Sequence, residues 1–159
     1  MIRFLKIAIP VFLLGFVTGN AFWYLFSPLW IDRVVAEAAP AVVTDKPLKS
    51  GTFKDADSAH KGKGNAQILQ TADGAVLRLT EFEVTNGPDL EVWLVKASTP
   101  EKSADVKASE WVSLGQLKGN IGDQTYKIPD GTDIDSYGSV VIWCEQFGVL
   151  FSPATLTKS

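Results

Sequence analysis

Residues 139–144 read Ser-Val-Val-Ile-Trp-Cys, six consecutive positions without a charged side chain. Successive side chains of a β-strand point to opposite faces of its sheet. Both faces are apolar here, because Val, Ile and Cys stand at the even positions and Val and Trp at the odd positions after Ser139. A strand with two apolar faces is typical of a sheet that is covered on both sides. The pattern therefore predicts a central strand that ends at Cys144.

Short runs of β-branched, aromatic and leucine residues continue on the N-terminal and C-terminal sides of this segment. Residues 72–74 read Ala-Asp-Gly, a hairpin sequence, and residues 86–89 read Asn-Gly-Pro-Asp, a chain reversal in which Gly87 can adopt a positive φ. Residues 97–110 are polar and are expected to form a loop with about one helical turn. Strands are expected at 66–70, 75–84, 90–96, 111–114, 124–128, 139–144 and 149–151. Seven short strands at this spacing predict an all-β fold, an antiparallel β-sandwich or a barrel-like domain.

The second of these runs alternates in polarity. Leu77 and Leu79 stand on one face of the expected strand, and Arg78 and Thr80 stand on the other. This alternation predicts that the leucines pack in the core and that Arg78 and Thr80 face water.

The N-terminal end has a different composition, because residues 7–31 contain no Asp, Glu, Lys or Arg. As an α-helix this run would be about 37 Å long, against about 30 Å for the hydrocarbon core of a membrane. Arg3 and Lys6 precede the run, so the positive-inside rule predicts a cytoplasmic N-terminus and an extracytoplasmic C-terminal part, in the periplasm or at the cell surface. A cleaved signal peptide is the alternative, since residues 36–38 read Ala-Glu-Ala, but a signal peptide needs an apolar region of only about 7–15 residues.

These patterns divide the chain into three parts: a signal-anchor transmembrane helix at 1–35, a tether rich in Ala, Val and Pro at 36–49, and a β domain at 50–159. The whole chain has a net charge of −3, and residues 32–159 hold thirteen basic and eighteen acidic side chains. An acidic domain lacks the basic excess that binding to the phosphate backbone needs. We therefore expect the membrane to be a partner, through residues 7–31, and nucleic acid not to be one.

Soft ligands are scarce, because the chain has one Cys (Cys144), one His (His60) and only the initiator Met. No intrachain disulfide can form, and a blue-copper site or a c-type haem would need more Cys and His residues. A b-type haem held by Cys144, His60 or both is still allowed by ligand count, as is a free redox thiol. Each residue also has a structural interpretation: Cys144 as a small buried apolar residue, and His60 as a surface residue bonded to a nearby acceptor. No basic residue adjoins Cys144 to lower the pKa of its thiol, and the charge of Glu145 would raise that pKa.

From Gly51 to Leu156 the sequence resembles the DM13 domain, also called the electron-transfer DM13 domain. The matching motifs lie in the same order and are Gly51-x-Phe53, His60 with Gly62 and Gly64, Leu77-x-Leu79-x-x-Phe82, Asn86-Gly87-Pro88-Asp89-Leu90-x-Val92-x-Leu94, Leu114-Gly115-x-Leu117-Lys118-Gly119-Asn120, Gly122-x-Gln124-x-Tyr126-x-Ile128-Pro129, Val140-Val141-Ile142-Trp143-Cys144-x-x-Phe147-x-Val149-x-Phe151 and Ala154-x-Leu156.

The resemblance implies an all-β extracytoplasmic domain whose single cysteine, here Cys144, serves redox chemistry. The thiol would act either free or as a ligand to a prosthetic group such as haem, with His60 as a candidate second ligand. Such a domain would be an electron-transfer module rather than a stand-alone enzyme, and its partner would be a redox protein of the cell envelope. The alternative is a non-catalytic β-sandwich binding module of the envelope, in which Cys144 is a structural core residue.

Overall fold

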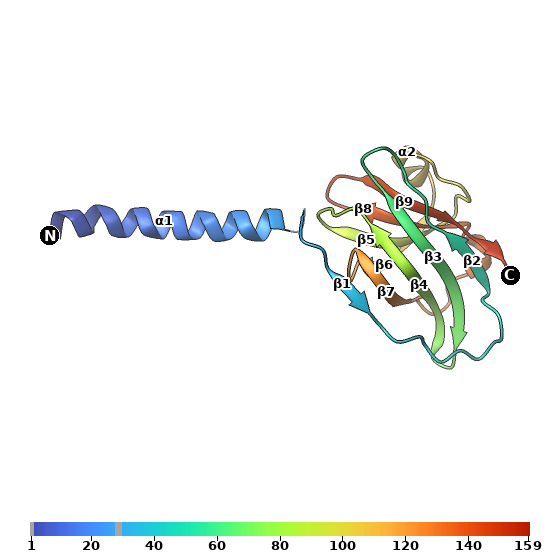
Figure 1. Cartoon of the computed structure of the whole chain (residues 1–159). Coiled ribbons are helices and arrows are strands. Elements are labelled where there is room, and N and C mark those ends of the chain that lie inside the picture. The colour runs from blue at the N-terminus through green and yellow to red at the C-terminus, as the bar shows by residue number, and fades with distance from the viewer. Residues whose placement is uncertain (1, 28–29) are drawn as a thin grey trace. The chain divides into compact units, whose positions relative to one another are not determined.

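The computed structural model describes residues 2–27 and 30–159 (Figure 1). The chain forms two compact units, residues 1–31 and residues 32–159. The first unit contains one long helix, and the second contains all the strands.

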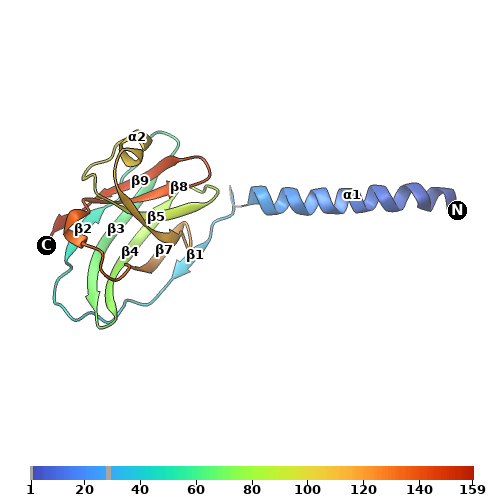
Figure 2. The same cartoon turned by 180° about the vertical axis from the view of Figure 1, so that it is seen from behind.

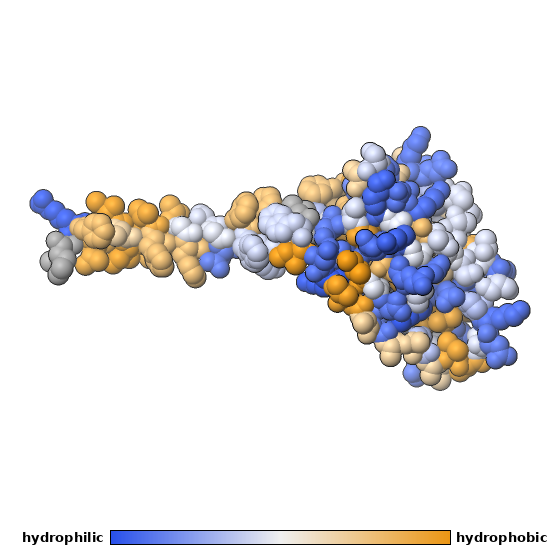
Figure 3. Space-filling view, in the orientation of Figure 1, coloured by the Kyte–Doolittle hydropathy of each residue, from blue (hydrophilic) through white to orange (hydrophobic). Residues whose placement is uncertain are grey.

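The first unit contains helix α1 (Ile2–Phe26). Within it, Arg3–Tyr24 is long and apolar enough to cross a membrane, as a signal sequence near an N-terminus would also be. Apolar side chains cover much of its surface (Figure 3). The helix begins before the charge-free run and ends within it, and residues 28 and 29 of that run lie outside the described residues. Position 28 is a proline, and the residue before a proline disfavours the α conformation, which explains why the helix ends at Phe26.

The second unit is a β-sandwich of two sheets (Figures 1 and 2). The larger sheet has the order β1-β7-β4-β3-β2-β10, in which β1 and β7 are parallel and the other neighbours are antiparallel. The smaller sheet has the antiparallel order β6-β5-β8-β9. The strands of the larger sheet are β1 (Val34–Ala36), β2 (Lys49–Thr52), β3 (Gly62–Thr71), β4 (Gly74–Val84), β7 (Ile121–Lys127) and β10 (Thr157–Lys158). Those of the smaller sheet are β5 (Leu90–Val95), β6 (Trp111–Gln116), β8 (Ser139–Cys144) and β9 (Val149–Thr155).

The fold confirms the predicted antiparallel β-sandwich, and each of the seven expected strands is present. The polar segment at 97–110 contains one short helix, α2 (Ser103–Lys107), as expected. Strands β1, β2 and β10 were not predicted, because they have two to four residues each and too few apolar positions to show a period. Val34 and Val35 of β1 lie in the part expected to be the anchor helix, and Ala36 and the residues after it lie in the expected tether. Both parts pair with the larger sheet.

Two apolar clusters hold the sandwich together. The larger cluster lies between the sheets and includes Leu77 and Leu79 of β4 and Cys144 of β8. The smaller cluster covers the outer face of the smaller sheet, where Val106 of α2 packs on it. All six residues of β8 are buried, which confirms that this strand is central and covered on both faces.

The prediction that Arg78 faces water is wrong, because its side chain is only 3% exposed. The residues after β1 cross this face of β4, and the carbonyl oxygens of Glu37 and Ala38 accept hydrogen bonds from the guanidinium group at 2.7 and 3.3 Å. Asp123 and Thr125 of β7 accept two more, each at 3.0 Å. An alternation pattern cannot reveal this cover, since it comes from a segment 40 residues away in the chain.

Candidate functional site

Cys144 is the last residue of β8, where it lies opposite Leu90 of β5 and Val149 of β9. Its side chain has no exposed surface and belongs to the core cluster between the sheets. The thiol donates a hydrogen bond to the carbonyl oxygen of Pro88, with 3.0 Å between Sγ and the oxygen. The only cysteine of the chain is therefore a buried, hydrogen-bonded thiol at the edge of the core.

Two loops meet beside the sulfur. Residues 145–148 connect β8 to β9, and the N–H of Gly148 donates to the carbonyl oxygen of Cys144 at 2.8 Å. Residues 85–89 connect β4 to β5 and carry the Pro88 carbonyl that accepts from the thiol. The N–H of Glu145 donates to the carbonyl oxygen of Asp89 at 3.0 Å and so joins the two loops. Asp89 and residues 145–147 are exposed, and residues 85–88 are half-buried, so both loops reach the surface of the domain.

The loop before β5 differs from the sequence prediction in one respect. The left-handed residue is Asp89, with φ of 51°, and not Gly87. Gly87 is needed for space instead, because a Cβ atom there would collide with the ring of Phe151. Asp is one of the few non-glycine residues that adopt left-handed φ values readily.

The surroundings of Cys144 keep its thiol protonated. Burial raises the pKa of the thiol above its ordinary value, and the negative charges of Asp89 and Glu145 act in the same direction. The backbone N–H groups of Phe147 and Gln146 lower the pKa, but they do not offset the burial. The direction expected for Glu145 from the sequence is thus confirmed.

His60 is a partly exposed residue of the loop before β3. Its Nδ1 atom lies 2.8 Å from Oδ2 of Asp57, and the backbone N–H groups of Ala59 and His60 donate to Oδ1 of the same carboxylate. These bonds, that of the His60 side chain first, lower the pKa of Asp57 to about 2. The imidazole ring also packs on Phe151, with 4.3 Å between ring centroids. Phe151 belongs to the same core cluster as Cys144, but in the described part of the chain no hydrogen bond joins His60 to Cys144.

A haem does not fit at these two residues as they stand. The Cys144 sulfur is enclosed by core side chains, and its proton is donated to Pro88. His60 is held by Asp57 and by the face of Phe151. In residues 2–27 and 30–159 there is no group of three or more His, Cys, Asp or Glu side chains that could hold a metal ion. The free thiol is therefore the form of Cys144 that the geometry supports.

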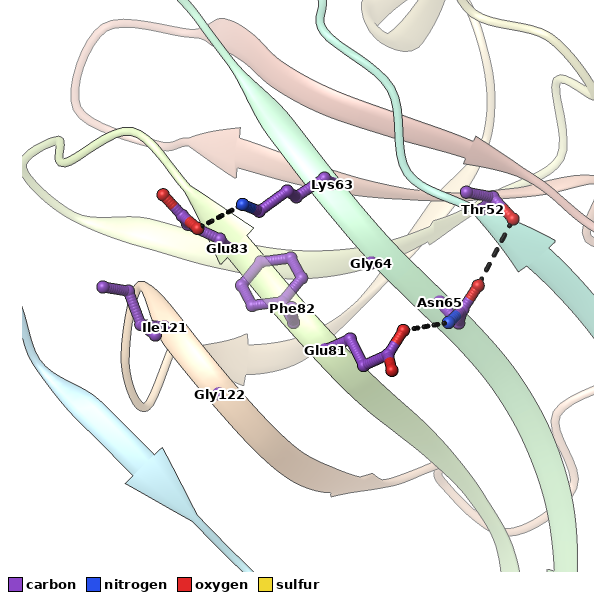
Figure 4. Close-up of a pocket in the computed structure, with 9 residues that line it drawn as sticks. All are labelled: Thr52, Lys63, Gly64, Asn65, Glu81, Phe82, Glu83, Ile121 and Gly122. Atoms are coloured by element: carbon purple, nitrogen blue, oxygen red, sulfur yellow. Dashed lines mark hydrogen bonds and ion pairs between the residues drawn. The ribbon is translucent and has the colours of Figure 1, made fainter.

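A pocket of about 560 Å³ lies elsewhere, on the larger sheet where β3 and β4 bulge (Figure 4). Gly64 and Glu81 both adopt positive φ there, of 108° and 51°. The polar side chains of the pocket pair with one another: Lys63 with Glu83 at 2.7 Å, and Asn65 with Glu81 at 3.5 Å. The pocket offers a surface hollow without a reactive group, and the sequence analysis did not indicate it.

Three tryptophans stack on the outer face of the smaller sheet, a feature that sequence reasoning also missed. They lie on neighbouring strands, Trp111 on β6, Trp93 on β5 and Trp143 on β8. The ring centroids of Trp111 and Trp93 are 3.8 Å apart, and those of Trp93 and Trp143 are 5.1 Å apart. Each tryptophan stands on an expected strand, but the order of the strands in the sheet was needed to bring them together.

A family model described as electron transfer DM13 matches residues 52–156. The match covers the β-sandwich from the end of β2 to the end of β9, and with it Cys144, His60 and the three stacked tryptophans. The chain belongs to the DM13 family. No curated protein and no solved structure matches it at a significant level.

Proposed function

We propose that this protein is a membrane-attached, extracytoplasmic electron-transfer domain in which Cys144 is the redox group and acts as a free thiol. Membership of the electron-transfer DM13 family supports the class of function. The apolar helix α1 supports attachment to a membrane, with Arg3 and Lys6 on the cytoplasmic side and residues 32–159 outside. A redox protein of the cell envelope is the partner that this function requires.

The observation that carries the role of Cys144 is its place at the end of β8, where its thiol bonds the Pro88 carbonyl of one loop and the loop at 145–148 begins at the next residue. N–H groups stabilise a thiolate, whereas burial stabilises the thiol. When the two loops part, water reaches the sulfur, and the burial that raises the pKa of the thiol is relieved. The thiol is then inert in the closed form and reactive in the open form.

The second candidate is a binding module in which Cys144 has only a structural role. The complete burial of the side chain favours it, since free cysteine is among the most buried residue types. The two candidates differ in how the sulfur becomes accessible. A gated thiol is reached by local opening of two loops, and a structural core residue is reached only when the whole domain unfolds.

Labelling of Cys144 by a thiol reagent at increasing, sub-denaturing urea separates the two candidates. Local opening exposes little surface, so the labelling rate of a gated thiol is almost independent of urea. Labelling through global unfolding rises with urea as steeply as the unfolding equilibrium itself. We expect the first behaviour for the full-length chain in detergent. The second behaviour, with no reversible oxidation of the native protein, would contradict the redox role.

A matched control comes from the same face of the same strand. Val140 is fully buried in the same core cluster, but it lies in the interior of β8 and not beside the loops. In a Cys144→Ala background, Val140→Cys introduces a thiol that we expect to be labelled only by global unfolding. The Cys144→Ala variant alone gives the baseline without a thiol. The anchor is tested separately: an exported protein that begins at Ala39 would show that α1 is removed.

A further inference from the structure

The stacked tryptophans form a continuous aromatic path from the surface of the smaller sheet to its interior. Trp111 is 47% exposed, whereas Trp93 and Trp143 are 3% and 2% exposed. The rings of Trp111 and Trp93 are almost parallel, at 10°, and those of Trp93 and Trp143 are inclined by 29°. All the tryptophans of residues 32–159 take part in this stack, and the two others in the sequence are Trp23 and Trp30.

The buried indole N–H groups donate to carboxylates. Nε1 of Trp93 donates to Oε2 of Glu91 at 2.7 Å, and Nε1 of Trp143 donates to Oε2 of Glu145 at 3.2 Å. A neutral acceptor would satisfy the N–H of a neutral indole. A carboxylate does more, because its negative charge stabilises the positive charge that the ring acquires when it loses an electron. The Lys107 ammonium group, 5.8 Å from the Trp143 ring centroid, opposes such a charge. Glu91 and Glu145 together carry more negative charge than Lys107 carries positive charge, so the net charge near the two buried indoles favours their oxidation.

The inner end of the stack adjoins the proposed redox group. Trp143 and Cys144 are consecutive residues of β8 whose side chains point to opposite faces of the sheet. One peptide unit therefore connects the indole on the outer face with the thiol in the core.

We propose that Trp111, Trp93 and Trp143 form a relay that carries single electrons between the surface of the smaller sheet and Cys144. This inference rests on the proposed function, because it takes Cys144 as the end of the path. The outer partner is a one-electron oxidant with a metal centre that approaches at Trp111.

The metal oxidant takes one electron from the indole of Trp111 and is reduced by one unit. Trp93 then reduces Trp111, and Trp143 reduces Trp93, so that the positive charge reaches Trp143. The Trp143 radical cation gives its Nε1 proton to Glu145. Cys144 then gives one electron to the Trp143 radical, and Glu145 returns the proton to Nε1, which restores the neutral indole. The S–H bond of Cys144 breaks in the same step and leaves a thiyl radical. The thiol proton leaves past the Pro88 carbonyl group into solvent.

The test uses a photogenerated ruthenium(III) polypyridyl complex as the oxidant and the full-length chain in detergent. Trp23→Phe and Trp30→Phe are present in every variant, so that all remaining tryptophans belong to the stack. Nitric oxide, a radical small enough to enter the core, captures the thiyl radical as an S-nitrosothiol. Peptide mass spectrometry locates this adduct, and transient absorption follows the tryptophan radicals. We expect an adduct at Cys144 and, in the Cys144→Ala variant, a longer-lived tryptophan radical.

The middle ring is the decisive position. Trp93→Phe keeps an aromatic ring in the core but removes the oxidisable indole. The Trp111 and Trp143 rings that remain have centroids at most about 9 Å apart. We expect the yield at Cys144 to fall about tenfold, equivalent to about 1.4 kcal/mol in the barrier. Trp111→Phe, at a half-exposed position where folding is not at risk, should lower the yield as well. Tyr137→Phe, an oxidisable residue outside the stack, is the matched control and should leave the yield unchanged.

An unchanged yield at Cys144 in both tryptophan variants would overturn the relay while leaving the redox role of Cys144 intact. Tryptophan radicals that form without any adduct at Cys144 in the parent protein would instead refute the proposed function, and the relay with it.

Discussion

Replacing Arg78 by alanine should loosen the segment that follows β1 and destabilise the sandwich. The Arg78 guanidinium group is the buried cation that joins this segment to the larger sheet, through the carbonyl groups of Glu37 and Ala38 and the side chains of Asp123 and Thr125. Its Nε atom is buried and has no hydrogen-bond partner among the described residues, so the guanidinium group bonds through its two terminal nitrogens.

The magnitude follows from what the missing guanidinium group leaves behind. Breaking a buried ion pair by removing one partner costs about 3–5 kcal/mol, and each buried acceptor left unpaired costs about 1–3 kcal/mol. Asp123 is 42% exposed, so water replaces the lost partner there and the penalty falls toward the lower end. We expect Arg78→Ala to lower the free energy of unfolding by about 3 kcal/mol. Arg78→Lys should lower it less, because one ammonium group cannot reach four acceptors.

Urea unfolding of the full-length chain in detergent measures the stability, and hydrogen exchange with mass spectrometry measures the local effect. Amide exchange in residues 34–43 should accelerate more than exchange in β8. The control is Lys63→Ala, which removes an exposed ion pair with Glu83 from the same sheet and should leave the free energy of unfolding almost unchanged. The reasoning is refuted if Arg78→Ala costs no more than this control and leaves exchange in residues 34–43 unchanged.

Three further predictions concern the loops and the edge of the larger sheet. Asp89→Asn removes a charge that raises the pKa of Cys144 but keeps a side chain that tolerates left-handed φ. The pH profile of Cys144 labelling should therefore move to lower pH. An unmoved profile would contradict the effect of the Asp89 charge on this thiol. Gly122→Ala should cost about 2–3 kcal/mol in urea unfolding, because φ is 101° there and a Cβ atom would collide with a carbonyl of β1; a loss below about 0.5 kcal/mol would contradict that contact. The pKa of Asp57 is lowered to about 2, so its bonds to His60 stabilise the protein above about pH 4 and are lost as the pH falls through 2. The difference in unfolding free energy between the parent and Asp57→Asn should therefore vanish near pH 2. A difference that persists there would argue against the hydrogen bonds.

The strands could be predicted from the sequence because their apolar side chains record burial. The alternation around Leu77 and the two apolar faces of residues 139–144 each indicate a local environment, and the structure confirms both. Arg78 shows the limit of this reasoning. A polar residue opposite a leucine looks the same whether its face meets water or a distant segment of the chain, and only the folded chain supplies the carbonyl groups that bury it.

The position of Cys144 at the end of a central strand was predictable, since the pattern of residues 139–144 runs through to it. Its chemistry was predictable only in part. The charge of Glu145 follows from the sequence, but burial, the main cause of the raised pKa, and the Pro88 acceptor follow from the packing of two loops. The relation of His60 to Cys144 could not be predicted, because they are 84 positions apart in the sequence and only the folded chain sets the distance between them.

The sequence by itself determined the composition of the molecule: an apolar N-terminal helix, an all-β domain of the DM13 family, and a single thiol with no second cysteine to pair with. These properties depend on residues that are close in the chain or on simple counts. Only the tertiary structure decided what surrounds that thiol and how the three tryptophans are arranged. Strand β5 pairs with β6, the next strand of the chain, on one side and with the more distant β8 on the other, and the contacts between their tryptophans exist only when the sheet has formed.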